Sequence, residues 1–167
     1  MKLIKLGIFS FLLLFLLITA ISLFIPSTIT ISKATRLRAT KQELMQQLAN
    51  PGEWKNWFPG ADTMQVLMIE GKPQGLILNE KKQRSLLITE SSDTAVKAVY
   101  QGINKNVTTG WNVLHGASTD SVSVQWYMQF KLRWYPWEKF ASLLFEKQYG
   151  TQMEMGLNKL KAYLEKD

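Results

Sequence analysis

The chain has 167 residues, a length typical of one domain, with 20 basic side chains, 13 acidic side chains and no cysteine. The lack of cysteine excludes disulfides, thiolate metal sites and a cysteine nucleophile. Because the chain has only one histidine, His115, a metal site built on paired histidines is excluded. The motifs contain no paired carboxylates, no Gly-rich phosphate loop and no G-x-S-x-G element, so the sequence predicts no catalytic residues, metal or cofactor.

The net charge of +7 is unevenly distributed along the chain. Residues 1–42 carry six basic side chains and no acidic one, whereas residues 43–167 carry 14 basic and 13 acidic side chains. Nucleic-acid-binding domains concentrate their positive charge on the folded surface. The distribution therefore argues against nucleic acid as a partner.

The N-terminal segment is predicted to contact the lipid bilayer through residues 6–25. No charged residue occurs between Lys5 and Lys33, and 16 of the 20 residues from Leu6 to Ile25 are apolar. Together these apolar residues cover every face of a helix. About 20 apolar residues span a hydrocarbon core of roughly 30 Å. The alternative is a signal peptide cleaved near residues 20–22. Because the apolar run continues to Ile25, the sequence favours a membrane anchor over residues 1–27.

The orientation of this anchor is set by basic residues on both sides. Lys2 and Lys5 precede the apolar run, and four basic residues follow it between Lys33 and Lys41. The first pair places the N-terminus inside the cell. A domain of residues 28–167 can be translocated despite flanking charge, so we expect it on the extracytoplasmic side of a single-pass protein.

Residues 28–38 alternate between polar and apolar side chains, which predicts a strand. Thr40 and Glu43 then have the spacing of a capping box, and the short helix that they begin ends at residues 50–52. A second short turn carries Trp54, Trp57 and Phe58. These three side chains either attach the short helices to the sheet or lie at the mouth of a cavity or at a membrane.

Six further strands are predicted between residues 64 and 134, separated by turn signals. Their ranges are 64–69, 75–80, 85–90, 95–101, 107–115 and 121–134. The last range alternates without a break, which predicts an antiparallel strand with one covered face. The apolar set is Val122, Val124, Trp126, Met128, Phe130, Leu132 and Trp134.

After Pro136 the apolar spacing becomes helical. The predicted buried stripe consists of Trp137, Phe140, Leu144, Met153, Gly156, Leu157, Leu160 and Leu164, with an interruption or kink at Gly150. The stripe should cover the apolar face of the preceding strand. Trp134, Tyr135 and Trp137, close to Arg133 and Lys139, suit either a membrane interface or an attachment at the start of the helix.

The predicted order is a strand, two short helices, six strands and a long C-terminal helix. It resembles the SRPBCC or START-like superfamily with the helix-grip fold of the Bet v 1 type, and in particular bacterial membrane-anchored proteins labelled polyketide cyclase/dehydrase. Asn50, Trp54 and Trp57 match the N-x-x-x-W-x-x-W turn of those proteins, and residues 150–161, with Glu154 at the acidic position, match their G-x-x-x-E-x-G-L-x-x-L-K tail. The usual A-P-x-x-x-V stretch is not matched, because Thr40 follows Ala39.

The resemblance implies an α+β domain in which a curved antiparallel sheet of about seven strands encloses a hydrophobic cavity beneath the terminal helix. It also implies location in a bacterial inner membrane. The candidate ligand-contacting residues are Tyr100, Trp111, Trp126, Met128 and Phe130 on the strands, Leu144 on the helix, and His115 as a polar group near the mouth. The alternative is that the aromatic side chains fill the core and that His115 lies at the rim of the sheet.

The sequence thus predicts a membrane-tethered domain that binds a small hydrophobic or amphipathic ligand, lipid-like or polyketide-like. One alternative is a cyclase or dehydrase that uses Tyr100, His115 or Asn112 in the same cavity. Another is an interaction or stress-response module whose pocket is filled. Neither the ligand nor the oligomeric state follows from the sequence.

Overall fold

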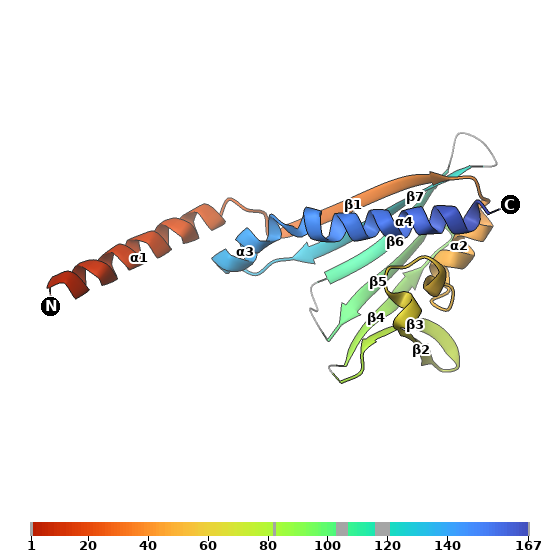
Figure 1. Ribbon diagram of the computed structural model, residues 1–167, viewed down its shortest axis with the longest axis horizontal. Coiled ribbons are helices and arrows are strands. Elements are labelled where there is room, and N and C mark those ends of the chain that lie inside the picture. The colour runs from red at the N-terminus through yellow and green to blue at the C-terminus, as the bar shows by residue number, and fades with distance from the viewer. Residues whose placement is uncertain (1, 82, 103–106, 116–120, 167) are drawn as a thin grey trace.

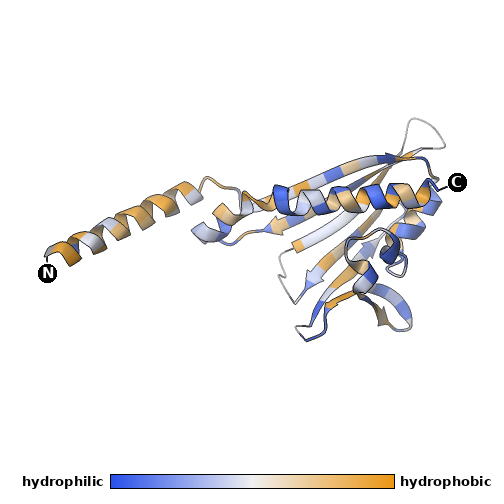
Figure 2. Ribbon diagram, in the orientation of Figure 1, coloured by the Kyte–Doolittle hydropathy of each residue, from blue (hydrophilic) through white to orange (hydrophobic). Residues whose placement is uncertain are grey.

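The computed structural model describes residues 2–81, 83–102, 107–115 and 121–166. Its first element, helix α1 (Lys2–Ser22), projects away from the rest of the chain (Figure 1). Apolar residues occur along its whole length (Figure 2), and its apolar stretch is exposed. The helix is long and apolar enough to cross a membrane, a property that a signal sequence near an N-terminus shares.

The described residues form one antiparallel sheet with the strand order β1-β7-β6-β5-β4-β3-β2. Every strand pairs with a sequence neighbour except β1, which lies on the far side of β7. The sheet is strongly curved, and helix α4 runs lengthwise over it (Figure 1). The strands are β1 (Thr28–Leu37), β2 (Gln65–Ile69), β3 (Lys72–Asn79), β4 (Arg84–Ser91), β5 (Ala95–Gln101), β6 (Val107–His115) and β7 (Val122–Lys131).

Two strand ends differ from the prediction by three residues, and the other differences are of one residue. β3 begins at Lys72 and not at residue 75, because a tight turn with positive φ at Glu70 and Gly71 connects it to β2. β7 ends at Lys131 and not at residue 134, at the point where its neighbour β1 begins with Thr28. Trp134 therefore lies outside the sheet and is exposed, although it continues the apolar alternation.

The inward face of β7 is the centre of the core, as predicted. Val122, Val124, Trp126, Met128 and Phe130 are buried and alternate with half-buried residues, so the predicted register is confirmed. Such alternation follows from the two-residue period of a strand.

The short helices cover the same face of the sheet. Helix α2 (Lys41–Ala49) begins with the predicted capping box: Thr40 Oγ1 accepts a hydrogen bond from the Glu43 backbone N–H (3.2 Å), and Glu43 Oε2 accepts one from the Thr40 N–H (2.8 Å). The 3₁₀ turns η1 (Trp54–Asn56) and η2 (Ala61–Thr63) follow. Trp54 and Trp57 are fully buried, which attaches this segment to the sheet.

The single long C-terminal helix of the prediction is divided. Helix α3 (Pro136–Ser142) is followed by a turn, by the π-helical segment η3 (Glu146–Gly150) and by helix α4 (Thr151–Leu164). Gly150 is the last residue of the π-helical segment. Such i→i+5 segments are rare and occur frequently at functional sites.

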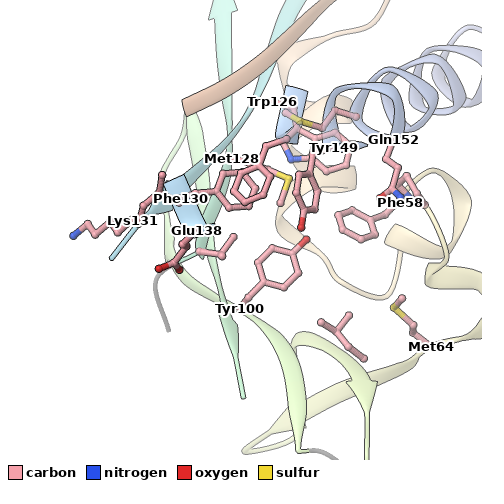
Figure 3. Close-up of a pocket in the computed structure, with 16 residues that line it drawn as sticks. Phe58, Met64, Tyr100, Trp126, Met128, Phe130, Lys131, Glu138, Tyr149 and Gln152 are labelled. Carbon is pink, nitrogen blue, oxygen red and sulfur yellow. The ribbon is translucent and has the colours of Figure 1, made fainter. Parts of the chain in front are cut away.

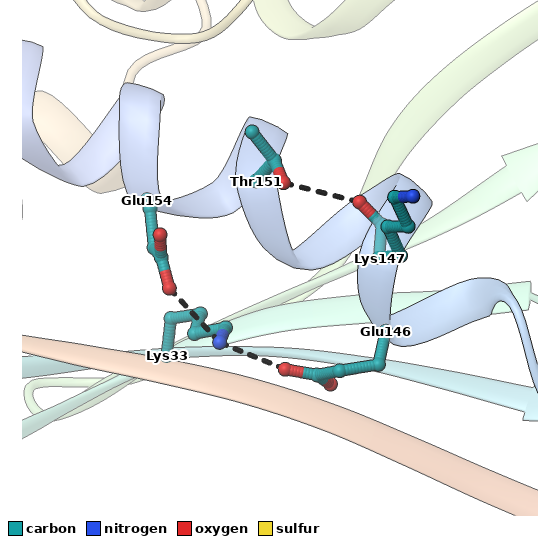
Figure 4. Close-up of polar contacts among 5 residues, drawn as sticks. All are labelled: Lys33, Glu146, Lys147, Thr151 and Glu154. Atoms are coloured by element: carbon teal, nitrogen blue, oxygen red, sulfur yellow. Dashed lines mark hydrogen bonds and ion pairs between the residues drawn. The ribbon is translucent and has the colours of Figure 1, made fainter.

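An ion-pair network joins this helical segment to the sheet. Lys33 of β1 places its Nζ 2.7 Å from Glu146 Oε1 and 2.9 Å from Glu154 Oε1 (Figure 4). The hydrogen bond with Glu146, followed by that with Glu154, raises the pKa of Lys33 above its usual value. The network therefore spans the junction between η3 and α4.

Candidate ligand-binding pocket

A pocket of about 310 Å³ lies between the inward face of the sheet and the helical segment that begins at Phe145 (Figure 3). Most of its lining is apolar. The lining residues are Phe58, Pro59, Met64, Leu78, Tyr100, Val107, Trp126, Met128, Phe130, Lys131, Leu132, Glu138, Phe145, Tyr149, Gln152 and Met153.

A cluster of aromatic side chains determines where this pocket begins. Trp54, Trp57 and Trp111 are fully buried and pack together, with ring centroids 5.3 Å apart between Trp54 and Trp111. Phe58 and Trp126, whose centroids are 5.4 Å apart, belong to the cluster and also line the pocket. The cluster therefore fills one part of the space enclosed by the sheet and forms a wall of the remaining part.

The pocket wall at Trp126 is held by hydrogen bonds. Trp126 Nε1 donates to Thr109 Oγ1 (2.8 Å), and this hydroxyl donates to the Tyr127 carbonyl (3.0 Å). Trp126 and Thr109 are both buried, so the indole N–H needs a hydrogen-bond partner within the protein, and the Thr109 hydroxyl provides it. The orientation of the indole ring is thus fixed from the sheet side.

The opposite wall comes from the start of the helical segment. Phe145, Tyr149 and Met153 follow one another at intervals of four residues, and all three line the pocket. A four-residue step in an α-helix overshoots a full turn by about 40°, and the wider π-helical segment η3 keeps the side chains aligned. Phe130 packs between them, with ring centroids 4.7 Å from Phe145 and 4.9 Å from Tyr149.

Two tyrosine hydroxyls provide a polar point in this apolar lining. Tyr100 from β5 and Tyr149 from η3 direct their hydroxyl groups toward each other (Figure 3). Burial, and to a smaller extent the neighbouring Tyr149, raises the pKa of Tyr100 above its usual value. The Tyr100 phenol is therefore neutral at physiological pH and can both donate and accept a hydrogen bond.

The remaining polar residues lie where β7 ends and α3 begins. Glu138 Oε2 accepts a hydrogen bond from the Arg133 backbone N–H (3.0 Å), which fixes the carboxylate at this rim. Lys131 is exposed and points away from the pocket (Figure 3). The rim is thus polar, and it lies beside α3, the element that contacts α1.

The structure brings four of the seven predicted site residues together. Tyr100, Trp126, Met128 and Phe130 all line the pocket. They come from two different strands, and their side chains share the inward face of the sheet (Figure 3).

Two of the predicted site residues lie elsewhere. Trp111 faces inward opposite Trp126, but it is fully enclosed by the aromatic cluster and does not reach the pocket. Leu144 is exposed in the turn between α3 and η3. The prediction assigned it to a continuous helical stripe, and the break after α3 moves it off the buried face.

The side chain of His115 lies outside the described residues, so its predicted role at the mouth is not described by the structure. Its backbone ends β6, eight residues from the pocket residue Val107, which corresponds to about 26 Å along a strand. Asn112, considered for catalysis, pairs instead with Gln125 (Nδ2 to Oε1, 3.5 Å) and does not line the pocket.

Sequence reasoning missed Phe145 and Tyr149, although a signal for them was present. Counting back from Leu160 and Leu157 in steps of three or four residues gives Met153, Tyr149 and Phe145. The predicted stripe instead continued through Leu144, Phe140 and Trp137. Leu78 and Val107 carried no distinguishing signal, because inward apolar residues occur on every strand.

Comparison with known proteins gives matches in structure only. No family model matches the chain, and no curated protein matches it in sequence. A START superfamily protein from Mycobacterium smegmatis matches with a TM-score of 0.53 and 14% identity, covering 81% of this chain and 97% of that chain. The Aha1 dimer from Colwellia psychrerythraea matches with a TM-score of 0.60 and 12% identity, covering 82% and 96%.

A protein of unknown function from Staphylococcus aureus matches at a similar level, with a TM-score of 0.60, 10% identity and coverage of 83% of this chain and 94% of that chain. Identities this low establish the fold alone. Together with the seven-stranded antiparallel sheet and the C-terminal helix, these matches confirm the predicted helix-grip fold, which the START superfamily protein shares.

Proposed function

We propose that this START-like domain binds a small apolar or amphipathic molecule, lipid-like or polyketide-like, in the pocket between the sheet and η3. The observation that carries the proposal is a space of about 310 Å³ with a mostly apolar lining and two convergent tyrosine hydroxyls. Ligand pockets have volumes of about 300–1,000 Å³ and use a few polar groups to orient the ligand. The START-like fold of the domain is consistent with this role.

The lining indicates how such a ligand would lie. Hydrocarbon or ring atoms fit against Met128, Phe130 and Phe145. The neutral hydroxyls of Tyr100 and Tyr149 can bind a hydroxyl or carbonyl oxygen. A charged headgroup is costly to bury without a partner, so it belongs outside the apolar pocket, at the polar rim where solvent can reach it.

The second part of the proposal is that α1 remains attached and holds the domain at a bacterial inner membrane, with the domain on the extracytoplasmic side. The length and apolar composition of α1 support a membrane span, and the side of the membrane follows from the distribution of basic residues around it. A tethered domain needs no diffusion step to meet a membrane-soluble ligand, which suits a lipid-like molecule.

A photoactivatable fatty acid carrying a diazirine tests the binding proposal. The full-length protein is placed in lipid nanodiscs, irradiated with the probe and digested for mass spectrometry. We expect label on the peptides that contain Met128 and Tyr149. Label on α1, which would contact the probe in the bilayer, serves as an internal reference.

Pocket-filling variants provide the control. Met128→Trp places a larger side chain in the pocket, whereas Met155→Trp makes the same change at an exposed site on α4. Met128→Trp should abolish label at Tyr149 and leave the label on α1, and Met155→Trp should change neither. Leu78→Phe is a second filling variant, and near-ultraviolet circular dichroism confirms that each variant is folded. Unchanged label at Tyr149 in folded, filled variants would refute ligand binding in this pocket.

A further inference from the structure

Helix α3 has the reverse of the usual arrangement of a surface helix. Its buried residues are Pro136, Lys139 and Ser142, and Lys139 is only 4% exposed. Its apolar residues point outward instead. We call Trp134, Trp137, Phe140, Leu143 and Leu144, which lie in and next to α3, the α3 collar. Four of these are between 63% and 66% exposed, and Phe140 is 36% exposed.

The buried polar face of α3 is occupied by the segment that follows α1. Lys139 Nζ donates to the Ile25 carbonyl (2.6 Å) and to Ser27 Oγ (2.9 Å). Ser22, the last residue of α1, is fully buried. These hydrogen bonds attach α3 to the segment that follows the apolar helix, so the outward side of α3 cannot be turned inward without breaking them.

The collar is near the exposed apolar residues at the end of α1. Leu23 and Phe24 follow α1 directly and are 72% and 89% exposed. α1 and α3 are in contact, so the collar lies at the same end of the domain as the candidate membrane span. Soluble surfaces rarely carry a large apolar patch without a partner. Because the apolar patch lies beside an apolar helix, one continuous apolar environment could contact both.

The side chains around the collar favour a lipid surface over a protein partner. Trp134 and Trp137 are residue types enriched at membrane–water interfaces, and Tyr135 stacks on Trp137 with the ring centroids 4.8 Å apart. Arg133 and Lys147 are exposed next to the collar. Of the nearby acidic groups, Glu146 is paired with Lys33, and Glu138 accepts a backbone hydrogen bond. Exposed basic side chains are attracted by anionic lipid headgroups.

We infer that the α3 collar lies in the headgroup region of the bilayer that α1 enters, with its apolar side chains at the boundary of the acyl chains. This inference rests on the membrane part of the proposed function and does not require a ligand in the pocket. Its consequence for that function is specific. The pocket rim at Leu132 and Glu138, beside α3, then lies close to the lipid surface, and a lipid-like ligand passes between the membrane and the pocket there.

Because the chain has no cysteine, single cysteines can be spin-labelled without background. The full-length protein is labelled at Leu143→Cys or Trp137→Cys in the collar and placed in nanodiscs that contain phosphatidylcholine and phosphatidylglycerol. Met155→Cys on α4 is the matched exposed control, and Leu14→Cys in α1 reports on membrane insertion. Power saturation then measures the accessibility of each label to oxygen, which enters lipid, and to a nickel chelate, which stays in water.

Both collar labels should be accessible to oxygen and protected from the nickel chelate, and the Met155→Cys label should be accessible to the chelate. If the collar labels are as accessible to the chelate as Met155→Cys while Leu14→Cys is still protected, the inference about the α3 collar is overturned, but the membrane span of α1 is not. Collar labels shielded from both reagents, or broadened by a second label, would overturn it in favour of a protein partner or a second copy. A Leu14→Cys label accessible to the chelate would overturn the membrane part of the proposed function itself.

Discussion

Gly156 and Gly150 occupy the same helical segment, yet alanine substitutions at the two positions should have opposite effects on stability. A Cβ added at Gly156 would lie 2.7 Å from Cζ3 of Trp126 and 3.0 Å from Cδ of Pro59. Both neighbours are rigid rings, and the indole is held by its hydrogen bond to Thr109. A Cβ added at Gly150 would lie 3.0 Å from Cε of Lys33 and 3.2 Å from Oε1 of Glu146, which are the ends of two flexible side chains.

The size of each effect follows from two opposing terms. Alanine is favoured over glycine inside a helix by about 0.8–1 kcal/mol. Overpacking of a core costs about 1–3 kcal/mol, and the rigid neighbours of Gly156 place that site in the upper part of the range. We therefore expect Gly156→Ala to lower the free energy of unfolding by about 1–2 kcal/mol. Gly150→Ala should raise it by about 0.5–1 kcal/mol, because the flexible ends of Lys33 and Glu146 can shift together and keep their ion pair.

Urea unfolding of the full-length protein in detergent micelles, followed by tryptophan fluorescence and linear extrapolation, measures both changes. Gly150→Ala is the matched control, since it makes the same chemical change without the contact to Trp126. A Gly156→Ala variant as stable as the wild type, or more stable, would show that α4 does not lie against Trp126. The position of the helix over the sheet would then be wrong.

Three further results are expected. Thr109→Val should lower the free energy of unfolding by about 1–3 kcal/mol, because it leaves the buried Trp126 N–H without an acceptor; an unchanged urea midpoint would contradict this. The raised pKa of Lys33 means that its ion pairs stabilise the fold fully below pH 10.5 and lose this effect as the pH rises through the folded-state pKa. The difference in unfolding free energy between the wild type and Lys33→Gln should therefore shrink above pH 10.5, and a constant difference would refute the pairing. Finally, protein from carbonate-washed membranes should have an intact N-terminus by mass spectrometry, whereas a mature chain that begins near Leu23 would show that the segment is a cleaved signal peptide.

The elements that were predicted correctly depend on local patterns. The alternation along β7 admits only one inward face, and the Thr40–Glu43 capping box is complete within four residues. Both patterns therefore determine structure without reference to distant parts of the chain. The number of strands was also predictable, because turn residues separate the strands at short intervals.

The pocket could be predicted only in part, since the same residue types fill a core and line a cavity. Trp111 and Trp126 are opposite each other on β6 and β7 and carry the same local signal. Only the docking of Trp54 and Trp57 encloses the first and leaves the second at the pocket wall. The reversed helix α3 was missed for a similar reason: the partners of Lys139 are backbone and side-chain oxygens more than one hundred residues earlier.

The two hydrogen bonds of Lys139 also restrict bending between the apolar helix α1 and the domain. Backbone hydrogen bonds of the helix end continue through the Ile25 N–H, which donates to the Ser22 carbonyl (3.1 Å), and the Ile25 carbonyl is the one that Lys139 binds. Ser27 is held at its hydroxyl by Lys139 and at its carbonyl by the Leu132 N–H (2.7 Å). In a bilayer, a helix changes its tilt to match the thickness of the hydrocarbon layer. If α1 spans a membrane as proposed, this attachment makes a change in its tilt rotate the whole domain, and lipid chain length would then set the angle at which the pocket rim faces the membrane.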